Sequence, residues 1–495
     1  MNKPVEFSIF VLYLAACIVI ALYFLKKASK GESAFWGAER SIGSFVSGVA
    51  LFATLISTGS FLGFVGIAYR LGWSLTTMAF GTSVALGFIL NMLLTGGAMR
   101  RYSELRGKFA MSAFFAERYN APTAVAGTLV VLLLYPFYAV AELIGSGLAL
   151  QYLFGIPFQI AVLITGVVLG GYVLLGGMLS VTWNDFMQGI LKFGVMVGLG
   201  ILALYAFGGL GPMLDKARTA NPYFLTLHPK VSPWTYIGLS LGGASFALSS
   251  PHVIMRLFAA RNAATARKSL SLTALLIFLF HVLGYLGVAG AALCIAPKLA
   301  RIDQVLFVTM DALFPAVLKG LAVAGIMAAA MSTTSGMLLA IGAEFSSNLY
   351  KRFVRPEADQ YQTLRVGKIV ILVVIIATTL MAMFQTSSIG VIVALTLEGV
   401  ASAFMAPLVV GLWWKRANGL GGFLGVAGGF VSFVIVHFAV GIPQFAEALV
   451  SIPVSFAAII VGSLVTAPPK PETIEFLEAI HGGPAASAPA EAVEA

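Results

Sequence analysis

A stripe of small and hydroxyl residues in one apolar segment has the types and spacing to bind a hard cation. Ala329, Ser332, Thr333 and Gly336 follow one another at helical spacings of three, four and seven positions, so they share one helix face. Hydroxyl oxygens are hard donors, which alkali and alkaline-earth cations prefer. The alternative is that these hydroxyls only bond back to carbonyls of their own helix.

A second segment could supply further oxygen ligands. Residues 52–66 contain three glycines and four hydroxyl residues, a composition typical of helices that are interrupted within a membrane. An unwound turn there would offer the backbone carbonyls of Ala53 and Ile56 to a cation. A cation site without a carboxylate is therefore predicted between these two segments.

A second interruption is predicted five spans later. Ser250 stands directly before Pro251 inside an apolar segment, and a hydroxyl N-cap followed by proline is a helix-start signature. The two interrupted segments then begin two sets of five spans. Because five is odd, the second set must be inverted relative to the first.

The elements that position these residues are membrane helices. The chain of 495 residues is 59% hydrophobic and only 10% charged, with a mean hydropathy of +0.96. About 20 apolar residues cross the hydrocarbon layer. On that rule thirteen spans are predicted, near 7–25, 43–68, 75–98, 123–150, 158–178, 187–208, 234–255, 270–294, 317–343, 365–386, 389–413, 420–441 and 446–466.

Charge placement predicts the orientation. The net charge of +10 is not a nucleic-acid footprint, because the basic residues form short clusters between apolar runs. Of the 30 Lys and Arg residues, 22 lie in segments on one side of the predicted spans. The positive-inside rule then places the N-terminus outside and the C-terminus in the cytoplasm of a cell whose plasma (inner) membrane holds the protein.

The chain divides into six predicted regions. The division is a first flanking helix and inner loop (1–40), core repeat 1 (41–208), an outer loop (209–233), core repeat 2 (234–413), two flanking helices (414–466) and a disordered cytoplasmic tail (467–495) with one short helix near 472–480.

Other classes of protein are disfavoured. The sequence shows no metal-ligand cluster, nucleophile motif or cofactor loop, so neither an enzyme nor a cofactor is expected. The tail is too short to fold as a signalling domain. If the driving ion were a proton, Glu142 and Glu398 would be the intramembrane acids to carry it.

Four stretches in order resemble the sodium/solute symporter family. These are 176–189 (GGMLSVTWND followed by QG), 329–335 (AAMSTTS), 348–351 (NLYK) and 411–416 (GLWWKR). The resemblance covers about residues 7–466. It implies an all-α membrane protein whose core is a LeuT-type inverted repeat of five helices, working by alternating access.

The resemblance also implies site residues. The sodium ligands would be Ala53, Ile56, Ala329, Ser332 and Thr333. The substrate site would comprise Ser57, Thr58, Gly59, Ser60, Gly243, Ala247, Ser335 and Gly336. Gating or structural roles fall to Asp185, Glu142, Pro251, Arg256 and Glu398, with Lys192 beside Asp185 at an inner helix junction.

The solute is expected to be a small monocarboxylate such as acetate or pyruvate, imported with sodium. Residues 251–258 and 263–269 look closest to the acetate and monocarboxylate branch. Where proline carriers have an acid and large aromatic residues, this chain has Leu55, Gly59, Gly243 and Ala247. The alternative is a proton- or sodium-coupled carrier of pantothenate, proline or another organic or amino acid. The oligomeric state stays open.

Overall fold

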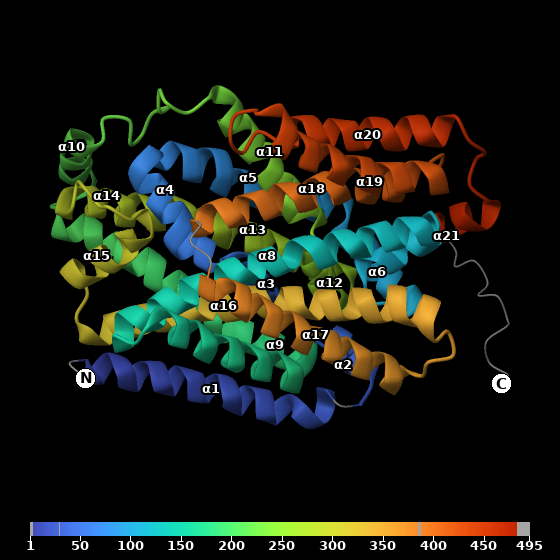
Figure 1. Ribbon diagram of the computed structural model, residues 1–495, viewed down its shortest axis with the longest axis horizontal. Helices are drawn as coiled ribbons and strands as arrows, with labels where there is room; N and C mark the ends of the chain where they lie inside the picture. The colour runs from blue at the N-terminus through green and yellow to red at the C-terminus, as the bar shows by residue number, and fades with distance from the viewer. Residues whose placement is uncertain (1–2, 29, 385–387, 483–495) are drawn as a thin grey trace.

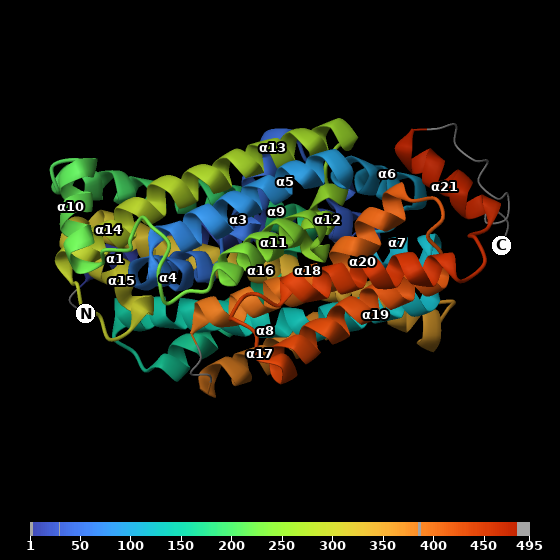
Figure 2. The same cartoon turned by 90° about the horizontal axis from the view of Figure 1, so that it is seen from above.

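The protein is a bundle of long helices that run roughly parallel to its longest axis (Figures 1 and 2). The computed structural model describes residues 3–28, 30–384 and 388–482. The N-terminus lies at one end of the bundle, with α10, α14 and α15. The opposite end holds α2, α6 and α21 (Figure 1).

The helices of the first half include the first predicted repeat. Their bounds are α1 Pro4–Ala28, α2 Glu32–Gly37, η1 Ala38–Arg40, α3 Ser44–Leu55, η2 Gly59–Gly63, α4 Phe64–Leu71, η3 Ser74–Gly81, α5 Thr82–Leu94, α6 Gly96–Arg106, α7 Met111–Arg118, α8 Ala121–Phe154, α9 Phe158–Ala206 and α10 Leu210–Ala220.

The helices of the second half include the second predicted repeat and the C-terminal helices. Their bounds are α11 Pro233–Ser249, α12 Pro251–Phe258, α13 Ala263–Leu279, η4 Phe280–Tyr285, α14 Leu286–Ile295, η5 Ile302–Gln304, α15 Val305–Leu313, α16 Ala316–Glu344, η6 Phe345–Val354, α17 Gln360–Phe384, α18 Ile389–Trp413, α19 Gly419–Ile435, η7 Val436–Val440, α20 Ala448–Leu464 and α21 Pro471–His481.

Ten helices among the described residues are long and apolar enough to cross a membrane. An eleventh span arises if α3 and the η2–α4 segment, which are bent by 62°, are counted as one. Two shorter apolar helices, Phe158–Gly171 and Ala448–Leu464, lie where the remaining spans are predicted. The protein is therefore a multi-pass membrane protein, and the count of thirteen stays a prediction.

The flanking helices expose apolar side chains on their outer faces. On α1, for example, Leu12, Val19 and Tyr23 are 68%, 64% and 74% exposed. Exposed apolar faces of this extent along a whole helix need an apolar solvent. Lipid is that solvent. The other face of α1 packs on α9 and α16, so α1 covers these two helices from outside.

The first predicted interruption is present. Helix α3 ends at Leu55, and Ile56 takes an extended conformation with φ −82° and ψ 95°. The chain restarts as the π-helical segment η2. A Cβ on Gly63 would lie 2.6 Å from the backbone nitrogen of Gly390, so only glycine lets η2 approach α18 this closely.

The second interruption is also present, with a different cap from the predicted one. Ser250 is extended (φ −71°, ψ 134°), and Pro251 begins α12 as its first residue. The Ser250 hydroxyl makes no capping bond and has no hydrogen-bond partner among the described residues. The backbone carbonyl of Ser250 instead accepts from Val253 and Ile254.

A junction between the fifth and sixth predicted spans is present within α9. Gly177, with φ +56° and ψ −169°, is non-helical and separates two helical parts, and the second part starts earlier than the predicted residue 187. A Cβ at Gly177 would lie 2.9–3.2 Å from atoms of Phe35, so glycine is needed for both conformation and packing. Residues 179–192 are therefore helical, and they lead directly into the bundle core.

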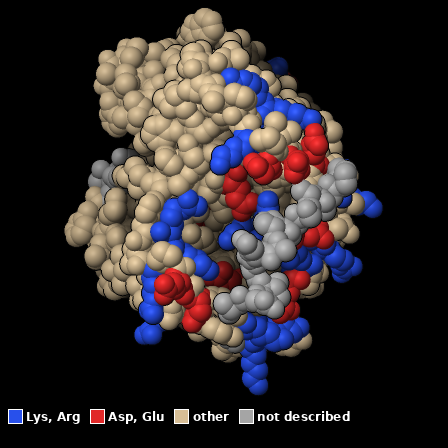
Figure 3. Space-filling model, turned by 90° about the vertical axis from the view of Figure 1, so that its right-hand side faces the viewer, with Lys and Arg blue, Asp and Glu red and all other residues tan. Residues whose placement is uncertain are grey.

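Charged side chains mark one end of the bundle. Lys, Arg, Asp and Glu side chains gather on the end that carries α2, α6 and α21 (Figure 3). Part of the predicted tail is ordered there, because α21 packs on α6 and α7 and buries Phe476 and Ile480. The short helix predicted near 472–480 is thus present as α21, Pro471–His481, and residues 483–495 lie outside the described residues. The predicted outer loop 209–233 contains α10.

Candidate ion and solute site

The oxygens predicted to bind sodium converge on a lysine. The Lys192 Nζ donates to the carbonyl of Ala53 at 2.5 Å, to the carbonyl of Ile56 at 2.9 Å and to the hydroxyl of Ser332 at 2.6 Å. Lys192 comes from α9 and is fully buried. These contacts satisfy the three donors of an ammonium group. The fold thus brings the two predicted ligand segments together around a cation that belongs to the chain.

The hydroxyls of α16 connect to α3 directly. The Ser332 hydroxyl lies 2.9 Å from the carbonyl of Ala53 and 3.3 Å from that of Ala329. The Thr333 hydroxyl donates to the carbonyl of Thr54 at 2.9 Å. All five predicted sodium ligands therefore lie at the α3–α16 contact, and Thr333 is directed at a neighbouring carbonyl.

A carboxylate lies on the other side of the first break. Glu142 of α8 accepts from the backbone N–H of Thr58 at 3.0 Å, and its second oxygen has no hydrogen-bond partner among the described residues. The first N–H groups of a restarting helix favour negative charge. The break is therefore held by an ammonium on its carbonyl side and a carboxylate on its N–H side.

A second pair of opposite charges lies nearby. Asp185 and Arg256 form an ion pair with an N–O distance of 2.5 Å, and they are 0% and 3% exposed. Asp185 lies two turns before Lys192 on α9, and Arg256 is 3.5 Å from the carbonyl of Ser332. Arg256 is thus paired inside the protein and does not face the lipid.

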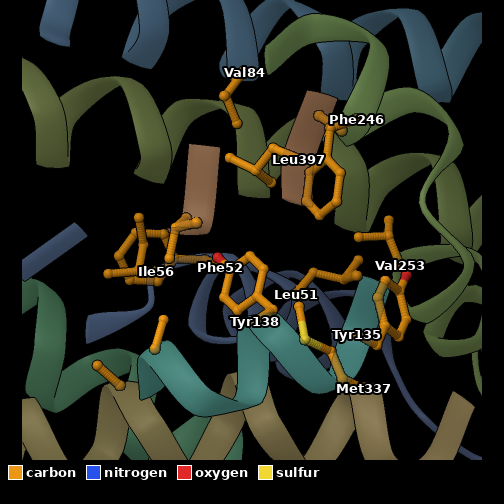
Figure 4. Packing of buried hydrophobic residues seen from close by; sticks show 14 of the residues in the cluster. Leu51, Phe52, Ile56, Val84, Tyr135, Tyr138, Phe246, Val253, Met337 and Leu397 are labelled. Carbon is orange, nitrogen blue, oxygen red and sulfur yellow. The ribbon is translucent and has the colours of Figure 1, made fainter. Parts of the chain in front are cut away.

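A small cavity lies beside the first break, lined mainly by aromatic and aliphatic side chains. Ile56 and Tyr138 border it on one side, and Phe246, Leu397 and Val84 face them across the gap (Figure 4). Its polar and aromatic lining includes Ser60, Phe64, Phe80, Tyr138, Phe246 and His281.

Most of the predicted substrate residues do not line this cavity. Ser60 is the one of the eight that lines it. Gly243 packs on Ser83 and Phe80, and Gly336 packs on Arg256 and Thr54. The remaining five are buried in the helices nearby: Ser57, Thr58, Gly59, Ala247 and Ser335.

The second break is held by neutral groups. The hydroxyl of Tyr135 lies 2.8 Å from His252 Nδ1 and accepts from the backbone N–H of His252 at 3.3 Å. His252 follows Pro251 in the first turn of α12. Glu398 lies elsewhere, because its carboxylate accepts from the backbone N–H of Ala448 at the start of α20.

Sequence reasoning missed the position of Lys192 and most of the cavity lining. The sequence predicts Lys192 at an inner helix junction, because the sixth span is expected to start only at residue 187. An ionisable residue next to a long apolar run is a signal of function. For Tyr138, Phe246 and His281 no comparable signal exists, since aromatic residues are common in every span.

The comparisons with known proteins agree with this geometry. The model of the family described as "Sodium:solute symporter family" matches residues 35–429. The osmoregulated proline transporter OpuE of Bacillus subtilis (strain 168) is 25% identical, over 92% of this chain and 93% of its own length. The sodium/proline symporter of Haemophilus influenzae is 24% identical, over 86% of each chain. These relatives do not confirm the acetate and monocarboxylate branch.

A solved structure has the same fold. The chain of a Na⁺-coupled sialic acid symporter in a substrate-bound outward-open state gives a TM-score of 0.81 at 20% identity. The match covers 94% of this chain and 99% of that one. The predicted LeuT-type architecture is confirmed. With most of its length matched by the family model, the chain belongs to the sodium:solute symporter family.

Proposed function

We propose that this protein carries a small zwitterionic amino acid with an apolar body, proline being the first candidate, by cation-coupled alternating access. The observation that carries the proposal is a buried carboxylate, Glu142, one helical turn beyond Tyr138, which lines the aromatic cavity. Spacing of i and i+4 places the two side chains on one face of α8.

The electrostatics at the first break favour a zwitterion over a simple monocarboxylate. A substrate carboxylate alone would approach the N–H groups of the restarting helix, where the carboxylate of Glu142 already accepts. Two carboxylates at one site repel each other. A substrate ammonium or iminium group instead offers a donor to the unpartnered oxygen of Glu142.

The aromatic lining suits the apolar body of such a solute. Phe64 and Phe80 stack with ring centroids 4.3 Å apart, and Phe246 faces them from α11. The acid and aromatic residues of proline carriers that are missing at Leu55, Gly59, Gly243 and Ala247 thus have counterparts on neighbouring elements. The similarity to proline transporters adds support.

Membrane orientation belongs to the same proposal. The N-terminus lies outside and the C-terminus in the cytoplasm of the plasma (inner) membrane. The support is that most Lys and Arg residues lie in segments of the end shown in Figure 3.

Uptake of labelled solutes into proteoliposomes tests the substrate. The panel comprises proline, acetate, pyruvate and pantothenate, each with proton and sodium gradients. We expect proline accumulation, and we expect Glu142→Gln to lower it at least about tenfold because the amide loses the negative charge that attracts the ammonium group.

Glu398→Gln is the matched control, since Glu398 is an equally buried acid away from both breaks. We expect it to keep most of the uptake. Accumulation of acetate or pyruvate with no accumulation of proline would contradict the proposed substrate class. That result would indicate a monocarboxylate as the solute.

A further inference from the structure

The ammonium of Lys192 occupies the position where a coupling cation would bind. Its three short contacts join α3, through Ala53 and Ile56, to α16, through Ser332. These are three of the five residues predicted to coordinate sodium. A sodium ion on the same oxygens would lie within a few ångströms of a fixed positive charge, and in a buried site that repulsion is strong.

The surrounding charges are already balanced. Asp185 on the same helix, Glu142 on α8 and Arg256 on α12 are the charged groups around Lys192, and each is at most 3% exposed. With all four groups ionised, two positive charges meet two negative ones. An added sodium ion would leave this buried cluster with a net positive charge, which is costly away from water. Tyr138 on α8 is the nearest further titratable group of that helix.

The other elements packed on α9 add no charge at this level. Helix α3 contains no ionisable residue, and the nearest ones on α16, Lys319 and Glu344, are about 18 Å along the helix from Ser332. The π-helical segment η4 contributes His281 and Tyr285, and α1 contributes Tyr13, which accepts from Gln188. Among the described residues, Lys192 is therefore the cation that contacts the Ala53 and Ile56 carbonyls and the Ser332 hydroxyl.

The contacts of Lys192 also link the predicted cation site to the chain segment beside the cavity. Ala53 and Ile56 end the first half of the broken helix, and residues 57–60 directly follow beside the cavity. A group that binds these two carbonyls therefore also orders the turn next to the cavity proposed for the solute.

We propose that the ammonium of Lys192 takes the place of the sodium ion of the family on the Ala53 and Ile56 carbonyls and the Ser332 hydroxyl, so that no sodium ion binds at this position. This inference rests on the proposed transport function. The same contacts hold the end of α3 directly before the turn that borders the solute cavity.

Binding of radioactive sodium to the purified full-length protein tests the exclusion of sodium without any solute. We expect no saturable binding to the wild-type protein. Lys192→Ala removes the fixed charge and leaves the oxygens, so we expect saturable binding to appear, with affinity at least about tenfold above wild type. Lys319→Ala, on α16 at the bundle surface, is the matched control and should behave like wild type. Saturable binding to wild type that Ser332→Ala removes would overturn the proposal.

Uptake of labelled proline into proteoliposomes is a second test of the exclusion of sodium. We expect a sodium gradient alone to drive no accumulation by wild-type protein. Sodium-driven accumulation by wild-type protein would overturn the proposal even if the Lys192 variant does not fold. If no solute is accumulated under any gradient, the proposed function fails, whereas the sodium-binding result still decides the role of Lys192.

Discussion

The two helix breaks of this protein are held by different kinds of contact. At the first break, between α3 and η2, a lysine caps the free carbonyls and Glu142 caps a free N–H, and the chain bends by 62°. At the second break, between α11 and α12, the partners are the neutral groups of Tyr135 and His252, and the helices together pass as one span.

The difference indicates a division of labour. Opposite charges on the two sides of a break match the partial charges at helix ends, so gain or loss of one charge changes the stability of the turn. A neutral hydrogen bond offers no such control by an ion. We therefore assign ion coupling to the first break and a mainly structural role to the second.

The largest effect is expected at the ion pair beside the first break. Asp185→Asn leaves Arg256 buried without a countercharge, and breaking a buried pair costs about 3 kcal/mol or more. We expect a clear loss of thermal stability and of transport. Adding Arg256→Gln should recover part of the stability, because the unpaired charge is removed.

The control is the exposed pair of Asp311 and Lys319, in which Asp311 is 52% exposed. Asp311→Asn should change stability by about 1 kcal/mol or less. Equal losses in the two variants, measured by thermal unfolding in detergent, would show that the buried pair has no special role.

A smaller effect is expected at the second break. Tyr135→Phe removes the hydroxyl that contacts the ring and the backbone of His252, which should cost about 1–2 kcal/mol. Because no charge is involved, the ion dependence of uptake should stay that of wild type. A change in proton dependence would contradict the division of labour between the breaks. Tyr152→Phe, whose hydroxyl lies near the surface, is a matched control.

The smallest effect is expected at Ser250. Its hydroxyl makes no capping bond, so Ser250→Ala should change the free energy of unfolding by less than about 0.5 kcal/mol. Ser332→Ala, at the first break, removes a hydroxyl that Lys192 contacts and should lower uptake. Thermal unfolding and proline uptake of both variants measure this contrast, and an equal loss in both would contradict it.

The sequence predicted both breaks and the class of fold, because glycine, hydroxyl and proline residues mark helix interruptions locally. It did not predict which group fills the site. Lys192 and Ala53 are 139 positions apart, and their contact depends on the bend of α9 at Gly177 and on its continuous helix beyond. A linear division into spans predicts Lys192 at an inner helix junction, whereas the folded helix places it in the core.

The lining of the cavity likewise could not be predicted from the sequence. Its lining comes from several elements, and a pattern of apolar residues does not tell which faces meet. Ser60 is predicted because the family resemblance implies substrate contacts directly after the sodium ligands of the interrupted segment. Tyr138, Phe246 and His281 lie outside the predicted helix breaks and the predicted hydroxyl stripe. Only the packing of the folded chain shows that they line the cavity.

An experimental structure of the wild-type protein in sodium-rich buffer tests the central claim most directly. We predict that the Lys192 Nζ lies between the carbonyls of Ala53 and Ile56 and the Ser332 hydroxyl, with no separate ion on these oxygens. Lys192 turned away, with a sodium ion coordinated by Ala53, Ile56 and Ser332, would contradict it.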